Sequence, residues 1–393
     1  MAGTHVAQDL ERLEALDRRL LHVFVAGPGR GEGLAVALPH RGWLVVDGCR
    51  AGDGSLPLER ILNRWLDAGD PIEALLLTHP HDDHVAGIPR VIEAYDPARI
   101  ALVASDPPSA SLLLEVIARY KRARTTAERM DADAVLAAVS AIQTWASKPD
   151  NALLPVTDGI AIEVDAPVAL RICAPVRSAM TRFLREPGRE SRILARANEM
   201  SAVVEIEFGQ TRVVLGGDLP RYRSGRRGRR VTTVPTGWDT VMRAHDRLGA
   251  HHGLKVPHHA SRDAHHPGLM ARRAGGGPRT WWVTPHNSSR LPRLAEGEGM
   301  DELLAHEPEI LLTALPAALR VQAGHPPPGR VRREQLVRRL DLQPTGDPFL
   351  DEAIEITPGS AVAALDSVWC IAFDDRGHVA GRWRGIAALE VVR

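Results

Sequence analysis

This chain of 393 residues has little cysteine, and no part of its sequence is a long apolar run. The three cysteines, Cys49, Cys173 and Cys370, are odd in number and far apart, which argues against a disulfide framework and suits a reducing cytosol. No stretch approaches the roughly 18 to 20 apolar residues of a membrane-spanning helix, and residues 1–20 lack the pattern of a secretion signal. The sequence therefore predicts a cytoplasmic protein with no membrane partner.

The chain also has no net charge, because 49 basic residues balance 49 acidic residues. Overall electrostatics therefore indicates neither nucleic acid nor an acidic membrane as a partner, and any charge-based function has to come from a local cluster. A hydrophobic content of 44% and a charged content of 25% are typical of a folded globular protein. The length allows one large α/β domain with additions, or two smaller domains.

Short strands and helices alternate along the first half of the chain. Strands are predicted at 21–25, 34–38, 43–46, 73–77 and 99–104, and helices at 58–66 and 88–95. This order contains βαβ units and predicts a sheet with outer helices. Residues 109–146 form a helical block, either a lid over the sheet or an ordinary packed layer.

The second half repeats this α/β rhythm. Strands are predicted at 160–164, 169–173, 202–208, 212–215, near 254 and at 281–284, with helices near 237–248 and after Ser261. We therefore expect two similar α/β halves that face each other. The segment 292–347 is rich in Pro and Arg, and the last 45 residues alternate like short strands.

The run Thr78–His84, Thr-His-Pro-His-Asp-Asp-His, directly follows a predicted strand and therefore lies on a loop. His79 and His81 are two residues apart, so on an extended segment both imidazoles point the same way, and Asp83 and His84 follow on the turn. Imidazole and carboxylate suit zinc or a similar divalent ion, and a loop at the end of a strand can leave a coordination position open for water. This run predicts a catalytic metal site.

The same run matches the His-x-His-x-Asp-His signature of the metallo-β-lactamase superfamily. The resemblance implies an α/β fold, a four-layer αββα sandwich, in which His79 and His81 bind the first of two divalent metals. Asp83 and His84 would hold the second metal. Asp47, at the end of an earlier strand, resembles the aspartate that supports such a site from behind.

Downstream segments resemble the nuclease-like hydrolase domain of bacterial competence DNA-uptake proteins. They are Asn198 and Ser201 before a strand pair, Asp218 after two glycines, and the run Leu254–Ser261 with Ala260 in place of glycine. The resemblance implies that Asp218 bridges the two metals. Asn198 stands where other superfamily members have a third histidine, so we expect no ligand from it.

The matched segments span about residues 21–295. We therefore assign a hydrolase domain to residues 1–295, with a helical insert at about 106–148. Residues 296–393 are predicted to form a small C-terminal extension of unknown role.

The sequence does not assign the last metal ligands, near residues 258–259 and 286, by spacing alone. Strand alternation would send His258 and His259 to opposite sides unless the strand ends and a turn brings both into the cleft. We favour His258 as ligand or proton donor, although the pair at 251–252 shows that this stretch is rich in histidine. Ser261 belongs to the same matched run. His286 falls near the place of the last histidine ligand in the superfamily, but the usual His-Pro spacing is absent.

Two divalent ions, zinc or else manganese, would lower the pKa of bound water and clamp an anionic oxygen. The resulting hypothesis is a dinuclear phosphodiesterase or nuclease-like hydrolase with a metal-bridging hydroxide as nucleophile, held by Asp83 and Asp218. His258 or His259 would protonate the leaving oxygen, and Lys255 would contact a phosphate. The substrate would be a phosphodiester or another small anion.

Residues 221–230 include six arginines directly after Asp218. Such a loop can follow a nucleic-acid backbone, which makes nucleic acid a candidate partner, although basic loops are commonly just solvated.

Two other hypotheses stay open. One is a lactone, thioester or β-lactam hydrolase, whose neutral substrate would need an apolar pocket. The other is a non-catalytic metal-binding interaction module, which the missing His-Pro spacing and Ala260 favour.

Overall fold

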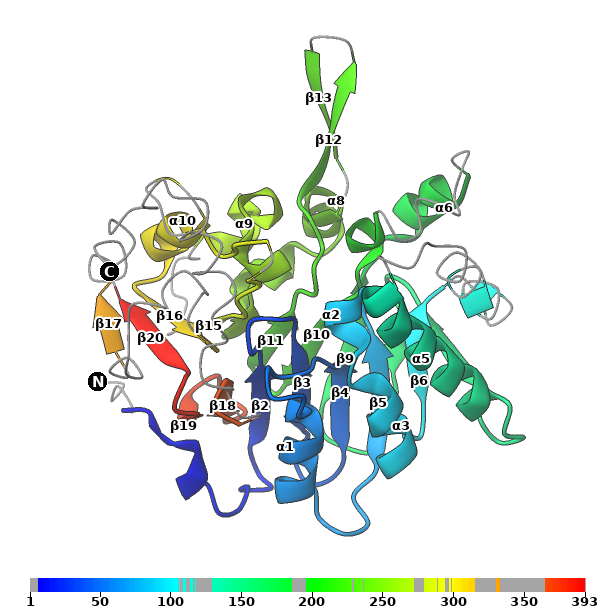
Figure 1. Ribbon diagram of the computed structural model, residues 1–393. Coiled ribbons are helices and arrows are strands. Elements are labelled where there is room, and N and C mark those ends of the chain that lie inside the picture. The colour runs from blue at the N-terminus through cyan, green and yellow to red at the C-terminus, as the bar shows by residue number, and fades with distance from the viewer. Residues whose placement is uncertain are drawn as a thin grey trace, which may run out of the picture.

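In this computed structural model, the described residues form two nine-stranded β-sheets at the centre of the protein (Figure 1). Strand order is β1-β19-β18-β2-β3-β4-β5-β6-β7 in the first sheet and β17-β20-β16-β15-β14-β11-β10-β9-β8 in the second. The structure describes residues 6–104, 106, 109–110, 114–115, 117, 129–185, 196–227, 230–235, 237–271, 279–287, 289–293, 297, 299–314, 330–332 and 365–392.

The first sheet is antiparallel from β18 to β4 and parallel from β4 to β7. Its strands are β1 (Gln8–Asp9), β2 (Leu21–Ala26), β3 (Gly33–Ala37), β4 (Trp43–Asp47), β5 (Ile72–Leu77), β6 (Ile100–Val103), β7 (Leu153–Val156), β18 (Val368–Phe373) and β19 (Val379–Arg384). Strands β2 to β5 are buried at every residue, because both faces of the sheet are covered.

The second sheet is parallel from β11 through β14 and β15 to β16, and antiparallel at β8 to β11. Its strands are β8 (Ala161–Ile162), β9 (Ala169–Ala174), β10 (Val203–Phe208), β11 (Thr211–Leu215), β14 (Gly253–Lys255), β15 (Thr280–Val283), β16 (Glu309–Leu312), β17 (Arg330–Arg332) and β20 (Leu389–Val392). The parallel strands point their carboxyl ends toward one edge.

Helices cover the outer face of each sheet and complete four layers. Packed on the first sheet are α1 (Pro57–Trp65), α3 (Ile88–Tyr95) and α5 (Arg129–Ala146); on the second are α8 (Gly237–Ala244), α9 (Pro267–Met270) and α10 (Gly299–His306). The other described helical elements are α2 (Asp82–Val85), α6 (Arg177–Arg185), and the 3-10 turns Leu10–Arg12, Ala197–Met200, Asp246–Ala250, His258–Ala260 and Arg262–Ala264. This arrangement confirms the predicted αββα sandwich.

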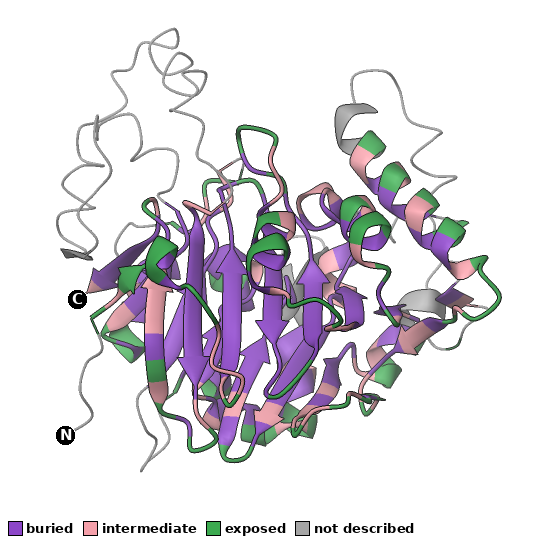
Figure 2. Ribbon diagram, turned by 90° about the horizontal axis from the view of Figure 1, so that it is seen from below, coloured by how far each residue is buried: buried purple, intermediate pink, exposed green. Residues whose placement is uncertain are grey.

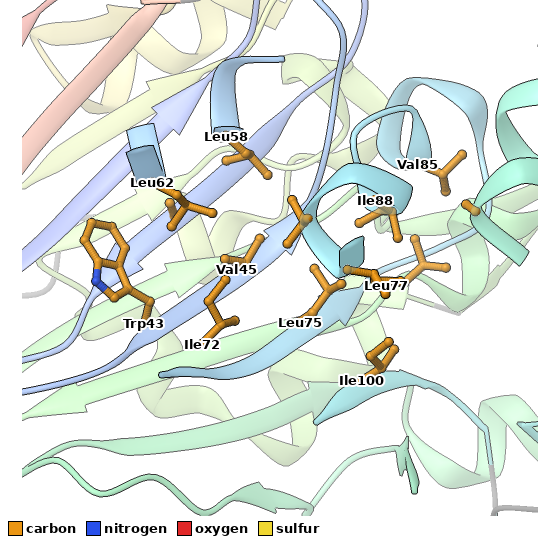
Figure 3. Packing of buried hydrophobic residues seen from close by; sticks show 14 of the residues in the cluster. Trp43, Val45, Leu58, Leu62, Ile72, Leu75, Leu77, Val85, Ile88 and Ile100 are labelled. Carbon is orange, nitrogen blue, oxygen red and sulfur yellow. The ribbon is translucent and has the colours of Figure 1, made fainter. Parts of the chain in front are cut away.

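Strand β4 shows how residue alternation builds the layers. Trp43 and Val45 point toward the helices and pack with α1 and α3 (Figure 3), while Leu44 and Val46 point into the core between the sheets. Burying each such side chain contributes about 1.5–3 kcal/mol. Figure 2 shows the consequence, since the central strands are buried along their length and exposed residues lie mainly on the outer elements.

The end of the chain joins both sheets. Strand β18 pairs with β2 of the first sheet, and β20 pairs with β16 of the second. Trp369 in β18 is fully buried, and its indole N–H donates to the carbonyl of Leu312 at 2.9 Å. The described part of the segment that we had assigned to a C-terminal extension is thus part of the sandwich, because its apolar strands complete both sheets.

The structure gives a definite form to two segments whose arrangement the sequence left open. The Arg-rich segment after Asp218 is a β-hairpin, with strands β12 (Tyr222–Arg227) and β13 (Arg230–Pro235), that projects from the body of the protein (Figure 1). Helix α5 of the predicted helical insert packs against α3 in the outer layer. None of the described helices is long and apolar enough to cross a membrane.

Candidate metal centre

The chemically reactive side chains lie where strands of both sheets end. In the first sheet, β4 ends at Asp47 and β5 ends at Leu77, directly before the His-rich loop. In the second sheet, Asp218, His258 and His286 follow the ends of β11, β14 and β15. Within each sheet these neighbouring strands are parallel, so their carboxyl ends meet at one edge, where α/β proteins place their ligands.

The loop after β5 brings three histidines together. His79 Nε2 lies 3.1 Å from His81 Nδ1, and the ring centroids of His79 and His84 are 4.1 Å apart. His81 is extended, with φ −91° and ψ 151°, and α2 begins at the next residue. The chain therefore turns at this point and carries His84 back toward His79.

Asp47 lies behind His84 and is completely buried. Its Oδ2 accepts hydrogen bonds from His84 Nδ1 at 2.7 Å and from Thr78 Oγ1 at 2.6 Å, and its Oδ1 accepts the Thr78 N–H at 2.7 Å. Burial raises the pKa of Asp47, an effect that His84 opposes. Because Nδ1 of His84 is held by Asp47, its Nε2 faces away from Asp47, toward Asp83 and Asp218.

Four side chains form what we call the carboxylate–imidazole cluster: Asp83, His84, Asp218 and His259. Each offers one ligand atom, and these atoms lie within 4.8 Å of one another. His84 Nε2 is 3.6 Å from Asp83 Oδ2 and 3.4 Å from Asp218 Oδ2; the corresponding distances for His259 Nε2 are 3.5 and 3.3 Å. Neither Nε2 atom makes a hydrogen bond within the described part of the chain, although both are buried.

A left-handed turn brings His259 into the cluster. His258, His259 and Ala260 have φ values of 49°, 50° and 61°, a conformation that costs a non-glycine residue about 1–2 kcal/mol. The sequence favoured His258 as the ligand, but the structure reverses this preference. His259 Nδ1 donates to the carbonyl of Thr284 at 2.8 Å, so its Nε2 faces the carboxylates.

His258 lies beside the cluster with its side chain 23% exposed. Asn198 Nδ2 donates to His258 Nε2 at 3.1 Å, and His258 Nδ1 lies 3.4 Å from Asp263 Oδ1. Contact with His258 lowers the pKa of Asp263, so this carboxylate stays charged beside the imidazole ring. Asn198 thus contacts the site through His258.

Two serines hold backbone and ligand in place. Ser201 Oγ accepts the N–H of Asp218 at 3.0 Å and lies 3.5 Å from His79 Nδ1. Ser261 closes the left-handed turn, since its N–H donates to the carbonyl of His258 at 2.8 Å. Ser201 therefore fixes the backbone of Asp218 from a buried position, and Ser261 fixes the turn that carries His259.

His286 adds another imidazole to the site. Its Nε2 lies 3.6 Å from Asp83 Oδ2, and its ring stacks on that of His259 with 4.9 Å between centroids. Burial and the neighbouring His259 lower the pKa of His286, which favours the neutral, metal-binding form. His286 thus reaches the cluster despite the unusual spacing of its segment.

Lys255 has no access to a substrate phosphate, because its side chain is completely enclosed. Its Nζ contacts Glu32 Oε2, lies 3.7 Å from Asp218 Oδ1, and donates to the carbonyl of Gly217 at 3.2 Å. The contact with a phosphate that we expected from the sequence is therefore excluded by burial.

Sequence reasoning missed Glu32 and Thr284. The signal for Glu32 was the glycine-rich run Gly27–Gly33, which indicates close backbone approach. At Gly31, with φ 113°, a Cβ atom would lie 1.9 Å from the carbonyl oxygen of Asp83. Thr284 carried no signal in the sequence, because its role depends on the position of His259.

The imidazoles and carboxylates of the cluster stabilise each other's charged forms. Burial disfavours protonation of His259, but Asp218 and Asp83 outweigh it and raise the pKa to about 10. The same balance raises the pKa of His84 well above its usual value, and His259 and His84 hold that of Asp218 well below its own. A divalent cation would replace these imidazole protons.

The donor set fits divalent metal ions. Two carboxylates, and two buried Nε2 atoms without hydrogen bonds in the described residues, suit zinc or manganese. His79 and His81 offer a second position beside the cluster, and burial lowers the pKa of His79 well below its usual value, which keeps it neutral. The residues of the carboxylate–imidazole cluster therefore fit a divalent metal ion.

Comparison with known proteins identifies the family of this chain. A family model described as the metallo-beta-lactamase superfamily matches residues 29–266, and no curated protein matches the chain. Among solved structures, the chain is similar to a beta-lactamase domain protein from Burkholderia ambifaria, with 16% identity and a TM-score of 0.27. That similarity covers 48% of this chain and 47% of the other, so the chain spans about half the length of that structure. Since the family model covers more than half of the sequence, the chain belongs to the metallo-beta-lactamase superfamily.

Proposed function

We propose that this protein is a dinuclear phosphodiesterase or nuclease-like hydrolase. The observation that carries the proposal is the convergence of Asp83, His84, Asp218 and His259 on one buried point, with two imidazole nitrogens that make no hydrogen bond in the described residues. Membership of the metallo-beta-lactamase superfamily supports a metal-dependent hydrolase in general. The phosphodiester substrate is our further step.

The cluster would hold one ion, and His79 with His81 would hold the other, with Asp218 shared between them. When bound, such ions lower the pKa of water and neutralise charge on a phosphoryl oxygen. The chain itself orients the ligands: Asp47 holds Nδ1 of His84, and the Thr284 carbonyl holds Nδ1 of His259. Preorganised ligands need little rearrangement during the reaction.

His258 is the candidate proton donor for the leaving oxygen. It is partly exposed, its ring lies beside that of His259, and its Nδ1 lies 3.4 Å from the Asp263 carboxylate. Asn198 holds the other ring nitrogen at 3.1 Å. In this role His258 moves a proton without serving as a metal ligand.

Arginines in two segments that are connected to the cluster along the chain support an anionic substrate. Arg30 is exposed on the loop whose Glu32 N–H donates to the Asp83 carbonyl, and Arg30 pairs with His286 in a β-bridge. The hairpin β12–β13, whose sequence is rich in arginine, begins four residues after Asp218. Together with the resemblance to competence DNA-uptake hydrolases, these features lead us to propose nucleic acid as a substrate or partner.

We also propose a cytoplasmic location. All three cysteines are free and buried, and none is paired in a disulfide. Unpaired buried thiols suit a reducing compartment.

Hydrolysis of bis(p-nitrophenyl) phosphate by the purified protein, supplied with zinc or manganese, tests the proposal. We expect close to two metals per chain by elemental mass spectrometry and turnover that Asp83→Ala abolishes. Asp82→Ala is the matched control, because Asp82 is the adjacent carboxylate but lies outside the cluster. It should keep both metal and turnover.

The other outcomes separate the competing functions. Turnover of lactone, thioester or β-lactam substrates without turnover of the phosphodiester would replace the proposed substrate class. Bound metal with no turnover of any of these substrates would indicate a non-catalytic module.

A further inference from the structure

A buried ion pair joins the two sheets next to the cluster. Lys255, at the end of β14 in the second sheet, contacts Glu32, which directly precedes β3 in the first sheet. Both side chains are 0% exposed. Two charges without any solvent access are costly to desolvate, and such a pair is often no more stabilising than apolar residues of similar volume. Stability alone is therefore a weak reason for its presence.

The pair contacts the cluster through two routes. On one side, Lys255 Nζ lies 3.7 Å from Asp218 Oδ1, while Oδ2 of the same carboxylate faces His84 and His259. Lys255 Nζ also donates to the carbonyl of Gly217, the residue before Asp218. The ammonium group thus attracts the carboxylate electrostatically and hydrogen-bonds the backbone that carries it.

The second route runs through Thr284. Its Oγ1 donates to Glu32 Oε2 at 2.6 Å, and its carbonyl accepts the His259 Nδ1 hydrogen bond at 2.8 Å. Glu32 Oε2 is itself 3.7 Å from His259 Nδ1. Glu32 therefore fixes the residue that sets the direction of the His259 ring.

We propose that Glu32 and Lys255 are positioning residues of the metal centre. Lys255 aligns Asp218, and Glu32 aligns His259 through Thr284, so that ligands from separate strands reach one point with the correct geometry. The inference rests on the metal centre of the proposed function but not on its substrate. Ligand supports of this kind typically affect metal affinity by 10- to 100-fold.

The test is a double-mutant cycle with Glu32→Gln and Lys255→Met, and zinc is the probe. Each single change leaves a buried charge without its partner and should destabilise the metal-free protein. The double variant removes one charge of each sign, so the net charge of the site is unchanged. We expect it to regain much of the thermal stability of the metal-free protein, yet to bind zinc at least about 10-fold more weakly than the parent.

A second pair of variants keeps the test decisive if the charge variants fail to fold. Thr284→Val removes the hydroxyl that bonds Glu32 and should weaken zinc binding. Thr313→Val is the matched control, because Thr313 is equally buried and its Oγ1 donates to the Gly27 carbonyl in the same loop. It should leave zinc affinity unchanged.

Zinc affinity is measured by competition with a chromophoric chelator and needs no substrate. A double variant that folds and binds zinc like the parent would overturn the inference, as would equal zinc affinities of the two threonine variants. If the parent binds zinc but does not hydrolyse the phosphodiester, the proposed substrate is wrong, and the inference about Glu32 and Lys255 is unaffected.

Discussion

His251 and His259 lie beyond opposite ends of the short strand β14, are equally buried at 2% exposure, and have opposite chemistry. Burial lowers the pKa of His251 to about 3, whereas Asp218 and Asp83 raise that of His259 to about 10 against the effect of burial. His251 donates from Nδ1 to the Leu248 carbonyl and accepts the Trp281 indole N–H. Both of its nitrogens are thus used within the fold.

His259 has only one nitrogen committed in this way, because its Nε2 makes no hydrogen bond in the described residues and faces two carboxylates. The difference shows that burial by itself does not identify a functional histidine. The decisive features are a ring nitrogen left for a ligand and neighbouring carboxylates that would share the ion.

Replacing His259 tests the contrast most directly. We expect His259→Ala to weaken zinc binding by about 100-fold or more and to reduce kcat/KM by about 1,000-fold, because it removes a ligand of the cluster. His251→Gln is the matched control, since glutamine can both accept from Trp281 and donate to the Leu248 carbonyl. Chelator competition and steady-state kinetics measure both; equal metal loss in the two variants would refute the assignment.

His258 should separate proton transfer from metal binding. His258→Ala is expected to lower kcat by about 100-fold, in the range of a lost general acid, and to change the pH profile of kcat. Its zinc content should stay that of the parent, because His258 contacts Asn198 and Asp263 outside the cluster. Loss of zinc from this variant would instead make His258 a ligand.

The pKa of His251 predicts an acid-sensitive contribution to stability. Between pH 6.5 and about 3 the unfolded chain binds a proton at this residue that the folded chain does not, so its contribution is present above pH 6.5 and is lost as the pH falls. At pH 5 this loss amounts to about 2 kcal/mol. Between pH 7.5 and pH 5, the free energy of unfolding of the metal-free protein in urea should fall less for His251→Gln than for the parent. Equal decreases in the two proteins would contradict the lowered pKa of His251.

The left-handed turn beside His259 predicts the smallest effect. At φ 61°, Ala260 has a conformation that favours glycine, so Ala260→Gly relieves strain while it removes a buried methyl group. We expect this change to be less destabilising by about 1 kcal/mol than Ala138→Gly, which alters a buried position of helix α5. Equal costs in urea unfolding would show that the turn is unstrained.

Much of the fold could be predicted from local pattern. Apolar runs such as Leu75–Leu77 and the helical spacing of Leu58–Leu66 correspond to β5 and α1, because burial of a periodic face is a local property of the sequence. The pairing partners of the C-terminal strands could not be predicted in this way. Their alternation was visible, but pairing with β2 and β16 joins residues more than 60 positions apart, which no local pattern encodes.

The candidate site, too, could be predicted from the sequence only in part. The spacing of His79, His81, Asp83 and His84 indicated a metal site, because ligands within six positions are brought together by the chain itself. By contrast, strand alternation could not decide which member of the pair at 258–259 joins the carboxylate–imidazole cluster. That choice depends on three consecutive left-handed residues and on the Thr284 carbonyl.

The sequence by itself thus determined the layered α/β architecture and the metal-binding character of the loop after β5, since both depend on neighbours along the chain. Only the tertiary structure decided that His259 joins the cluster, that Lys255 is enclosed with Glu32, and that His251 is a structural residue. These outcomes depend on contacts between strands of different sheets and on the solvent that those contacts exclude.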